Sequence, residues 1–178
     1  MPNSLKIAFA GFEDAFAPAL VLFAGKEGAL EAAATQRIGK TASARIAAAA
    51  SAESFSGKSG SALVLPAETA FGDTPMHVTV MGGEKGEGAV DYLKLGGQVQ
   101  AKLPKGRDVS ILALLPGGAM SAPDAAEFAL GLRLAAYRFD RYQTQKKDED
   151  SAPKSVSITI LVDNPSAARK EMKARDAI

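Results

Sequence analysis

The sequence contains no cysteine, no tryptophan and a single histidine, His77. Without cysteine there is no disulfide and no thiolate metal site, which fits a reducing compartment and makes the cytoplasm the expected location. A lone histidine gives little support for a zinc centre, because zinc takes three or four protein ligands. Since His77 begins an apolar stretch, we interpret it as a structural residue.

An excess of charge of either sign is also missing. The chain has 21 basic and 20 acidic residues, a formal net charge of +1, so no overall field attracts nucleic acid or an anionic membrane. The apolar stretch Ala15–Gly25 is interrupted by Pro18 and is far shorter than the ~20 residues of a membrane span. Glu13 and Asp14 stand where a signal peptide carries positive charge. The sequence therefore predicts no association with a membrane.

The composition is that of an ordinary globular domain, with 47% hydrophobic and 23% charged residues in a chain of 178. Short apolar runs alternate with alanine-rich or amphipathic stretches, a pattern that predicts strands alternating with helices. The six expected strands are Leu5–Ala10, Leu20–Ala24, Ala62–Leu65, His77–Met81, Val109–Leu115 and Val156–Val162. Because parallel strands need helical crossovers, we predict a three-layer α/β domain, with helices on both faces of a mixed sheet of about six strands.

Helix signals separate these strands. The expected helices are two alanine-rich pieces within 27–52, divided by Gly39, and the stretches 89–102, 122–142 and 165–178. Ser121 and Asn164 stand where N-caps are expected, and Glu171 can pair with Arg175 one turn later.

The longest of these helices is predicted to have an unusually wide apolar surface. Phe128, Leu132, Ala135 and Phe139 recur on one face, and a second apolar row contains Leu130, Leu134 and Tyr137. Such a surface predicts burial against more than one neighbour.

Two triplets imitate the end of a phosphate-binding P-loop, Gly39-Lys40-Thr41 and Gly57-Lys58-Ser59. That motif needs a further glycine five residues before its second one, where this chain has Ala34 and Ala52. Neither triplet directly follows an expected strand, so we interpret both as ordinary turns.

The region 138–150 holds the charge clusters. Three adjacent acids at 148–150 alternate in direction and cannot converge on a cation, which favours a solvated loop. The one basic cluster consists of Arg138, Arg141, Lys146 and Lys147. Because acidic residues stand beside it, subunit or domain contacts are favoured over phosphate contacts.

Two segments resemble a known family. Residues 135–147 read Ala-Ala-Tyr-Arg-Phe-Asp-Arg-Tyr-Gln-Thr-Gln-Lys-Lys, and Phe55–Pro66 is a Phe-Ser-Gly-Lys-Ser-Gly loop running into an apolar strand that ends in proline. Both are similar to stretches of the N-terminal domain of M17-type leucyl (cytosol) aminopeptidases, and the resemblance extends over nearly the whole chain. One departure is the sequence Val80-Met81-Gly82-Gly83, where the family usually has a Val-Gly-Leu-Gly type of loop.

The resemblance implies a macro-domain-like fold over residues 1–163, followed at 164–178 by the start of a linker helix toward a C-terminal catalytic domain. In the family that catalytic domain holds two divalent metal ions, zinc or manganese, and releases N-terminal amino acids from peptides, within a hexamer. The family's metal-binding motif has no counterpart here, so we expect this chain to contain no catalytic, cofactor-binding or metal-binding residue. It is expected to be inactive alone and to serve assembly or regulation.

Two alternatives stay open. The chain is a stand-alone ADP-ribose-binding or nucleotide-binding module of macro type if the glycine-bearing loops 82–88 and 116–118 form a ligand site, with Glu13 or Asp14 contacting adenine. It is a DNA-binding accessory domain if Lys146 and Lys147 contact phosphates.

Overall fold

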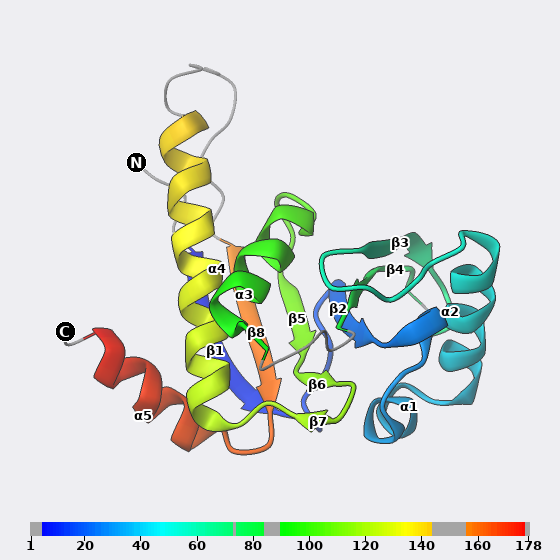
Figure 1. The fold of residues 1–178 in the computed structure, drawn as a ribbon, viewed down its shortest axis with the longest axis horizontal. Helices are drawn as coiled ribbons and strands as arrows, with labels where there is room; N and C mark the ends of the chain where they lie inside the picture. The colour runs from blue at the N-terminus through cyan, green and yellow to red at the C-terminus, as the bar shows by residue number, and fades with distance from the viewer. Residues whose placement is uncertain (1–4, 73, 84–89, 144–155, 177–178) are drawn as a thin grey trace.

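The computed structural model describes residues 5–72, 74–83, 90–143 and 156–176, with only the helical backbone for residues 139–143 (Figure 1). The strands are β1 (Leu5–Gly11), β2 (Ala19–Ala24), β3 (Ala62–Glu68), β4 (Met76–Gly82), β5 (Val109–Leu112), β6 (Leu114–Leu115), β7 (Gly118–Ala119) and β8 (Val156–Val162). The helices are the single 3-10 turn η1 (Lys26–Gly28) and α1 (Ala32–Ile38), α2 (Lys40–Ala52), α3 (Tyr92–Lys102), α4 (Ala122–Gln143) and α5 (Pro165–Asp176).

Six strands form one sheet in the order β1-β8-β5-β2-β4-β3. The first five run parallel, and only β3, at the edge, is antiparallel to its neighbour β4. The prediction of a six-stranded mixed sheet in an α/β domain is therefore confirmed. The strand order was not predicted, because alternation along the chain does not determine which strands become neighbours.

Alternate residues of the central strands supply two separate hydrophobic cores. On β2, Val21 and Phe23 face the core formed with α3, α4 and α5, whereas Leu20 and Leu22 face the core formed with α1 and α2. All four side chains are almost completely buried, which explains the continuous apolar sequence of this strand. Helices on both faces of the sheet, as predicted, make the domain three-layered.

None of the described helices combines the length and the apolar character needed to cross a bilayer.

The apolar stretch predicted as one strand over Val109–Leu115 is divided in two. Strand β5 ends at Leu112, and Leu114–Leu115 turns away from the sheet to pair with Gly118–Ala119 in a two-stranded hairpin. Gly117 and Gly118 have positive φ angles of 101° and 136° at its turn. Residues on both sides of the break are buried, so hydrophobicity alone could not locate it.

Helices α3 and α4 lie side by side with their backbones in contact (Figure 1). A Cβ atom at Gly96 would clash with the carbonyl oxygen of Phe128 and lie 2.9 Å from the amide nitrogen of Leu132. A Cβ atom at Gly131 would clash with the carbonyl oxygen of Leu93. Glycine at both positions therefore permits this close approach.

The second apolar row of α4 is not buried as predicted. Phe128 and Leu132 of the first row are fully buried, but Leu134 is 45% exposed and Tyr137 is 64% exposed. No described element covers these two side chains, so the prediction of burial is wrong for them in this chain. Phe139, at the end of the first row, has its side chain outside the described part of the structure.

Candidate functional site

The carboxyl ends of the five parallel strands meet at one edge of the sheet, which is where α/β folds bind ligands. Of the residues predicted to form a ligand site, Glu13 and Asp14 follow β1, Gly83 follows β4, and Pro116 and Gly117 form the turn between β6 and β7 just beyond β5, so they lie along this same edge. Glu13 and Asp14 are exposed there. Of the loop 82–88, only Gly82 and Gly83 belong to the described residues, and Gly82 is still part of β4.

A loop of the chain itself lies over the ends of β2 and β4. At Gly57, with φ of +81°, a Cβ atom would clash with the carbonyl oxygen of Gly25 and lie 3.0 Å from the amide nitrogen of Lys26. At Gly82, a Cβ atom would clash with the carbonyl oxygen of Lys58. The backbone nitrogen of Gly82 donates to the carbonyl of Ser61 at 2.7 Å. The backbone of the loop 57–61 is thus in direct contact with the backbone at the ends of β2 and β4, where a ligand phosphate would approach a glycine.

The β6–β7 hairpin fills the adjacent part of the edge. The ring of Pro116 would lie 3.3 Å from a Cβ atom at Gly25 and 3.1 Å from one at Gly83. The backbone nitrogen of Gly117 donates to Oε2 of Glu31, 3.2 Å away, which ties the hairpin to the start of α1. Among the described residues, the space over β2 is therefore occupied by the chain's own loops.

Arg37, at the end of α1, organises the loop after β1. Its Nε donates to the carbonyl of Phe12 and its Nη2 donates to the carbonyl of Asp14 at 2.7 Å. Its guanidinium lies 4.1 Å from the centre of the Phe16 ring, a cation–π contact. This role was missed from the sequence, because a single arginine in an alanine-rich helix carries no pattern that names its partner.

The two P-loop-like triplets lie at other kinds of position. Gly39 separates α1 from α2, so the first triplet follows a helix. The second belongs to the loop over β2 and β4 described above. Neither directly follows a strand, which agrees with their interpretation as turns.

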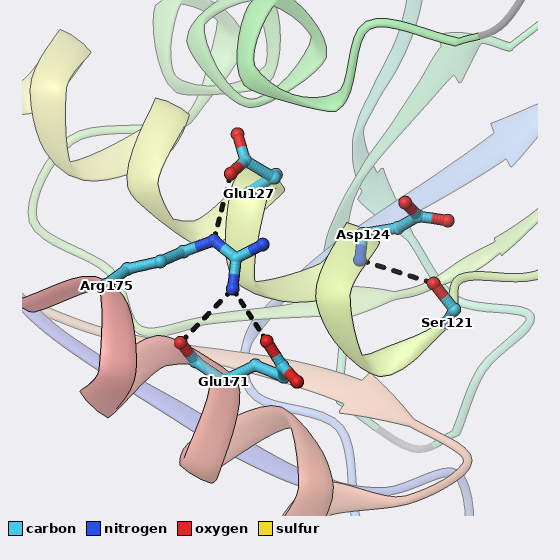
Figure 2. Close-up of polar contacts among 5 residues, drawn as sticks. All are labelled: Ser121, Asp124, Glu127, Glu171 and Arg175. Atoms are coloured by element: carbon cyan, nitrogen blue, oxygen red, sulfur yellow. Dashed lines mark hydrogen bonds and ion pairs between the residues drawn. The ribbon is translucent and has the colours of Figure 1, made fainter.

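An ion pair between Arg175 and Glu127 joins α5 to α4, and a second pairs Arg175 with Glu171 within α5 (Figure 2). Arg175 donates from Nε to Glu127 at 2.9 Å and from Nη1 to Glu171 at 2.9 Å, and these hydrogen bonds raise the pKa of Arg175. The predicted helical pair of Glu171 with Arg175 and the predicted cap of Ser121 are confirmed. Ser121 Oγ accepts from the backbone nitrogen of Asp124 at 3.3 Å. The ion pair between Arg175 and Glu127 stabilises the packing of α5 against α4.

The C-terminal helix also enters the core. Ala168 and Met172 of α5 are buried against the sheet, and Arg169 donates to the carbonyl of Phe9 in β1 at 3.0 Å. A predicted cap is confirmed here too, since Asn164 Oδ1 accepts from the backbone nitrogen of Ala167 at 3.1 Å. Helix α5 is therefore packed as an integral part of this domain.

His77 lies near the amino end of β4, away from the loops at the carboxyl edge. Its Nδ1 is buried and has no hydrogen-bond partner among the described residues. Burial and the nearby positive charge of Arg107 lower its pKa below the ordinary value of 6.5. Among the described residues, no group of three or more His, Cys, Asp or Glu side chains could hold a metal ion.

The free energy of unfolding should fall as the pH is lowered through about 6.5, because the unfolded chain then binds a proton at His77 that the folded chain does not. The loss is complete below the lowered pKa of the folded state. An NMR titration of the single histidine gives that pKa, and urea unfolding at several pH values gives the loss. In His77→Asn this component should be absent; an unchanged pH dependence would contradict the assignment.

Of the predicted basic cluster, the structure describes the side chain of Arg138 only, and it is exposed on α4. Arg141, Lys146, Lys147 and the acids at 148–150 lie outside the described side chains. Exposed apolar side chains lie near Arg138 in the same helix, and they include Leu134 and Tyr137.

Comparison with known proteins gives the family. A family model described as "Cytosol aminopeptidase family, N-terminal domain" matches residues 20–146. A probable cytosol aminopeptidase of Methylorubrum extorquens is 40% identical over 159 residues, covering 89% of this chain and 31% of the relative. One from Bradyrhizobium sp. is 36% identical and covers 100% of this chain and 36% of the relative. The chain thus spans about a third of the length of these curated relatives.

Solved structures show the same fold. A mutant of tomato leucine aminopeptidase matches with a TM-score of 0.66 and 20% identity, over 98% of this chain and 36% of that one. A Trypanosoma brucei macrodomain, solved with ADP-ribose, matches with a TM-score of 0.55 and 11% identity, over 96% of this chain and 68% of that one. The expected macro-domain-like fold is confirmed, and the chain belongs to the cytosol aminopeptidase family as an N-terminal domain.

Proposed function

We propose that this chain is the non-catalytic N-terminal domain of a metal-dependent leucyl aminopeptidase, in which it serves assembly or regulation. The observation that carries the proposal is the family match over residues 20–146, in a chain that spans about a third of its relatives. The remaining part of such a protein would hold two zinc or manganese ions and release N-terminal amino acids from peptides. The whole protein would be cytoplasmic and hexameric.

The described residues do not fit those metal ions, since they bring together no group of three possible ligands. This supports a division of labour in which the metal ions belong to a domain that follows α5. Helix α5 would then serve both to pack against α4 and to lead into that domain.

An apolar patch on α3 and α4 supports a role in assembly. We call Leu93, Leu134 and Tyr137 the α3–α4 patch; they are 39%, 45% and 64% exposed. The backbone of Leu93 contacts Gly131 at the helix crossing, and Leu134 and Tyr137 lie three and six residues further along α4. Large apolar side chains gathered on a surface are typical of protein contacts. We propose that the catalytic domain covers this patch.

The first test is activity. The purified 178-residue chain should not hydrolyse leucine p-nitroanilide in the presence of manganese or zinc, whereas a chain extended by the catalytic domain should. Clear turnover by the short chain alone would contradict the proposal that it is non-catalytic.

Replacing both Leu134 and Tyr137 by lysine should weaken association with a separately produced catalytic domain by about tenfold or more, because contacts at the centre of an interface dominate its energy. Leu134 and Tyr137 are 45% and 64% exposed and belong to neither buried core cluster, so the melting temperature should change little. Binding can be measured by calorimetry. The matched control is Lys40→Glu on α2, an exposed position on the opposite face of the sheet; equal losses in both variants would contradict the assignment of the patch.

The macro-type alternative predicts micromolar binding of ADP-ribose. Against it stands the packing of Gly57, Gly82 and Pro116 over β2 and β4, where such a ligand would enter. Calorimetry with ADP-ribose on the same preparation should give no heat of binding. A micromolar dissociation constant would favour the ligand-binding module instead.

A further inference from the structure

The edge strand β3 has one side without a partner strand in the part of the chain that the structure describes. The backbone nitrogen of Gly82 bonds to the carbonyl of Ser61, which makes these two residues a hydrogen-bonded pair of the antiparallel ladder. Such pairs alternate along the ladder, so Leu63 and Leu65 also bond to β4. The N–H and C=O groups of Ala62 and Val64 therefore point outward from the sheet.

A groove lies beside these outward groups. It has a volume of about 530 Å³ and is lined on one side by Ser61–Val64 of the strand and its approach, and on the other by Glu53–Ser56 after α2. Val64 is 48% exposed, and the segment 53–56 includes the exposed hydroxyl groups of Ser54 and Ser56. The groove thus joins unpaired strand backbone to polar side chains, a combination that suits an extended peptide.

The length of the free edge limits what can occupy it. The next residue whose N–H would point outward is Pro66, which has no N–H, and the ladder is irregular between Leu65 and Glu68. Two donors and two acceptors remain, on Ala62 and Val64. This is enough for a short segment and too little for a stable merger of two sheets, since short and proline-bearing edges are how proteins avoid pairing with copies of themselves. Among the described residues, Glu53 is the only charged one that lines the groove, which favours a neutral or basic segment.

We propose that the outer edge of β3 is a peptide-binding site, at which a short, extended, neutral or basic segment of another polypeptide pairs with Ala62 and Val64. The site borders the loop over the ends of β2 and β4, lies on other elements than the α3–α4 patch, and does not depend on the aminopeptidase assignment. Its affinity would come mainly from backbone hydrogen bonds, and its specificity from the side chain opposite Val64, where a β-branched residue is favoured.

The test uses the 178-residue chain and a fluorescent, N-acetylated and C-amidated pentapeptide of alternating threonine and valine. Titration should shift the amide NMR signals of Ala62 and Val64, and fluorescence anisotropy should give a saturable curve. The same peptide with every backbone nitrogen methylated cannot donate to the edge, and it should not bind. Absence of shifts up to millimolar peptide, or equal binding of the methylated peptide, would overturn the proposal.

Val64→Pro removes one outward donor and leaves the ladder to β4 intact, because the N–H of Val64 does not bond to β4. It should weaken peptide binding about threefold to tenfold, the effect of one hydrogen bond. Val64→Thr keeps both the N–H and the branched side chain and should bind like the wild type. If the proline variant does not fold, the methylated peptide still decides the question. A dimer seen by sedimentation without peptide, and lost in Val64→Pro, would assign the edge to a second copy and overturn the peptide proposal.

Discussion

Gly131→Ala should destabilise the domain by about 3 kcal/mol or more, although alanine is the better helix former by about 1 kcal/mol. The added methyl group would clash with the carbonyl oxygen of Leu93 and lie 3.2 Å from the Cα atom of Gly96. Both are backbone atoms of α3, which cannot turn aside as a flexible side chain can. Relief requires the two helices to separate, which would disrupt the core that Phe128 and Leu132 form with the sheet.

Gly97→Ala is the matched control, in the partner helix α3 and one residue from Gly96 at the crossing. A Cβ atom there would meet only the Cβ of Ala135, at 3.9 Å, an ordinary contact. This change should stabilise the domain by about 0.5 to 1 kcal/mol. Urea unfolding of the two variants should therefore give effects of opposite sign. Equal stability of Gly131→Ala and the wild type would show that α3 and α4 are not in backbone contact.

Gly57→Ala should also cost about 3 kcal/mol or more, because it combines two effects. The residue has a φ angle of +81°, which costs alanine about 1 to 2 kcal/mol. In addition, the new Cβ atom would clash with the Gly25 carbonyl, and overpacking of this kind costs about 1 to 3 kcal/mol. We expect the loss in denaturant unfolding, with amide shifts concentrated at the ends of β2 and β4.

Gly117→Ala separates the two effects. Its φ angle is +101°, yet among the described residues no atom beyond its own chain neighbours lies within 4 Å of the position a Cβ would take. It should cost only the backbone contribution, about 1 to 2 kcal/mol. If the two variants lose the same stability, the loop over β2 and β4 can move aside without a loss of free energy. The packing of that loop over the carboxyl edge of the sheet would then no longer argue against a bound nucleotide.

The sequence predicts which segments are strands far better than how their ends are arranged. Runs such as Leu20–Ala24 are apolar on both faces and bounded by glycine, so their identity follows from local pattern. The break after Leu112 has no such signal, because Leu114 and Leu115 are as buried in the hairpin as they would be in the sheet. Only the tertiary arrangement tells the two apart.

The loops that cover the carboxyl edge of the sheet could not be predicted from the sequence, for a different reason. Contacts such as that between Gly57 and Gly25 join backbone atoms of segments that are distant in the sequence. A glycine in the sequence does not reveal whether it forms a turn, contacts a ligand or packs against another segment of backbone. The exposed part of α4 shows the converse. Leu134 and Tyr137 have the periodicity of buried residues, and their sequence does not say whether the covering surface belongs to this chain.

The pairing of β1 with β8 has a consequence for how the chain acquires its structure during synthesis. Leu5 lies opposite Val156, and β8 is the only strand of the described residues that pairs with β1. At about 5 to 20 residues per second, a ribosome needs roughly 8 to 30 s to make the intervening chain. During that time β1 has no strand to pair with, although it is synthesised first. The edge of the sheet that contains β1 therefore forms last, and a nascent chain stalled before β8 would expose β1 to chaperones.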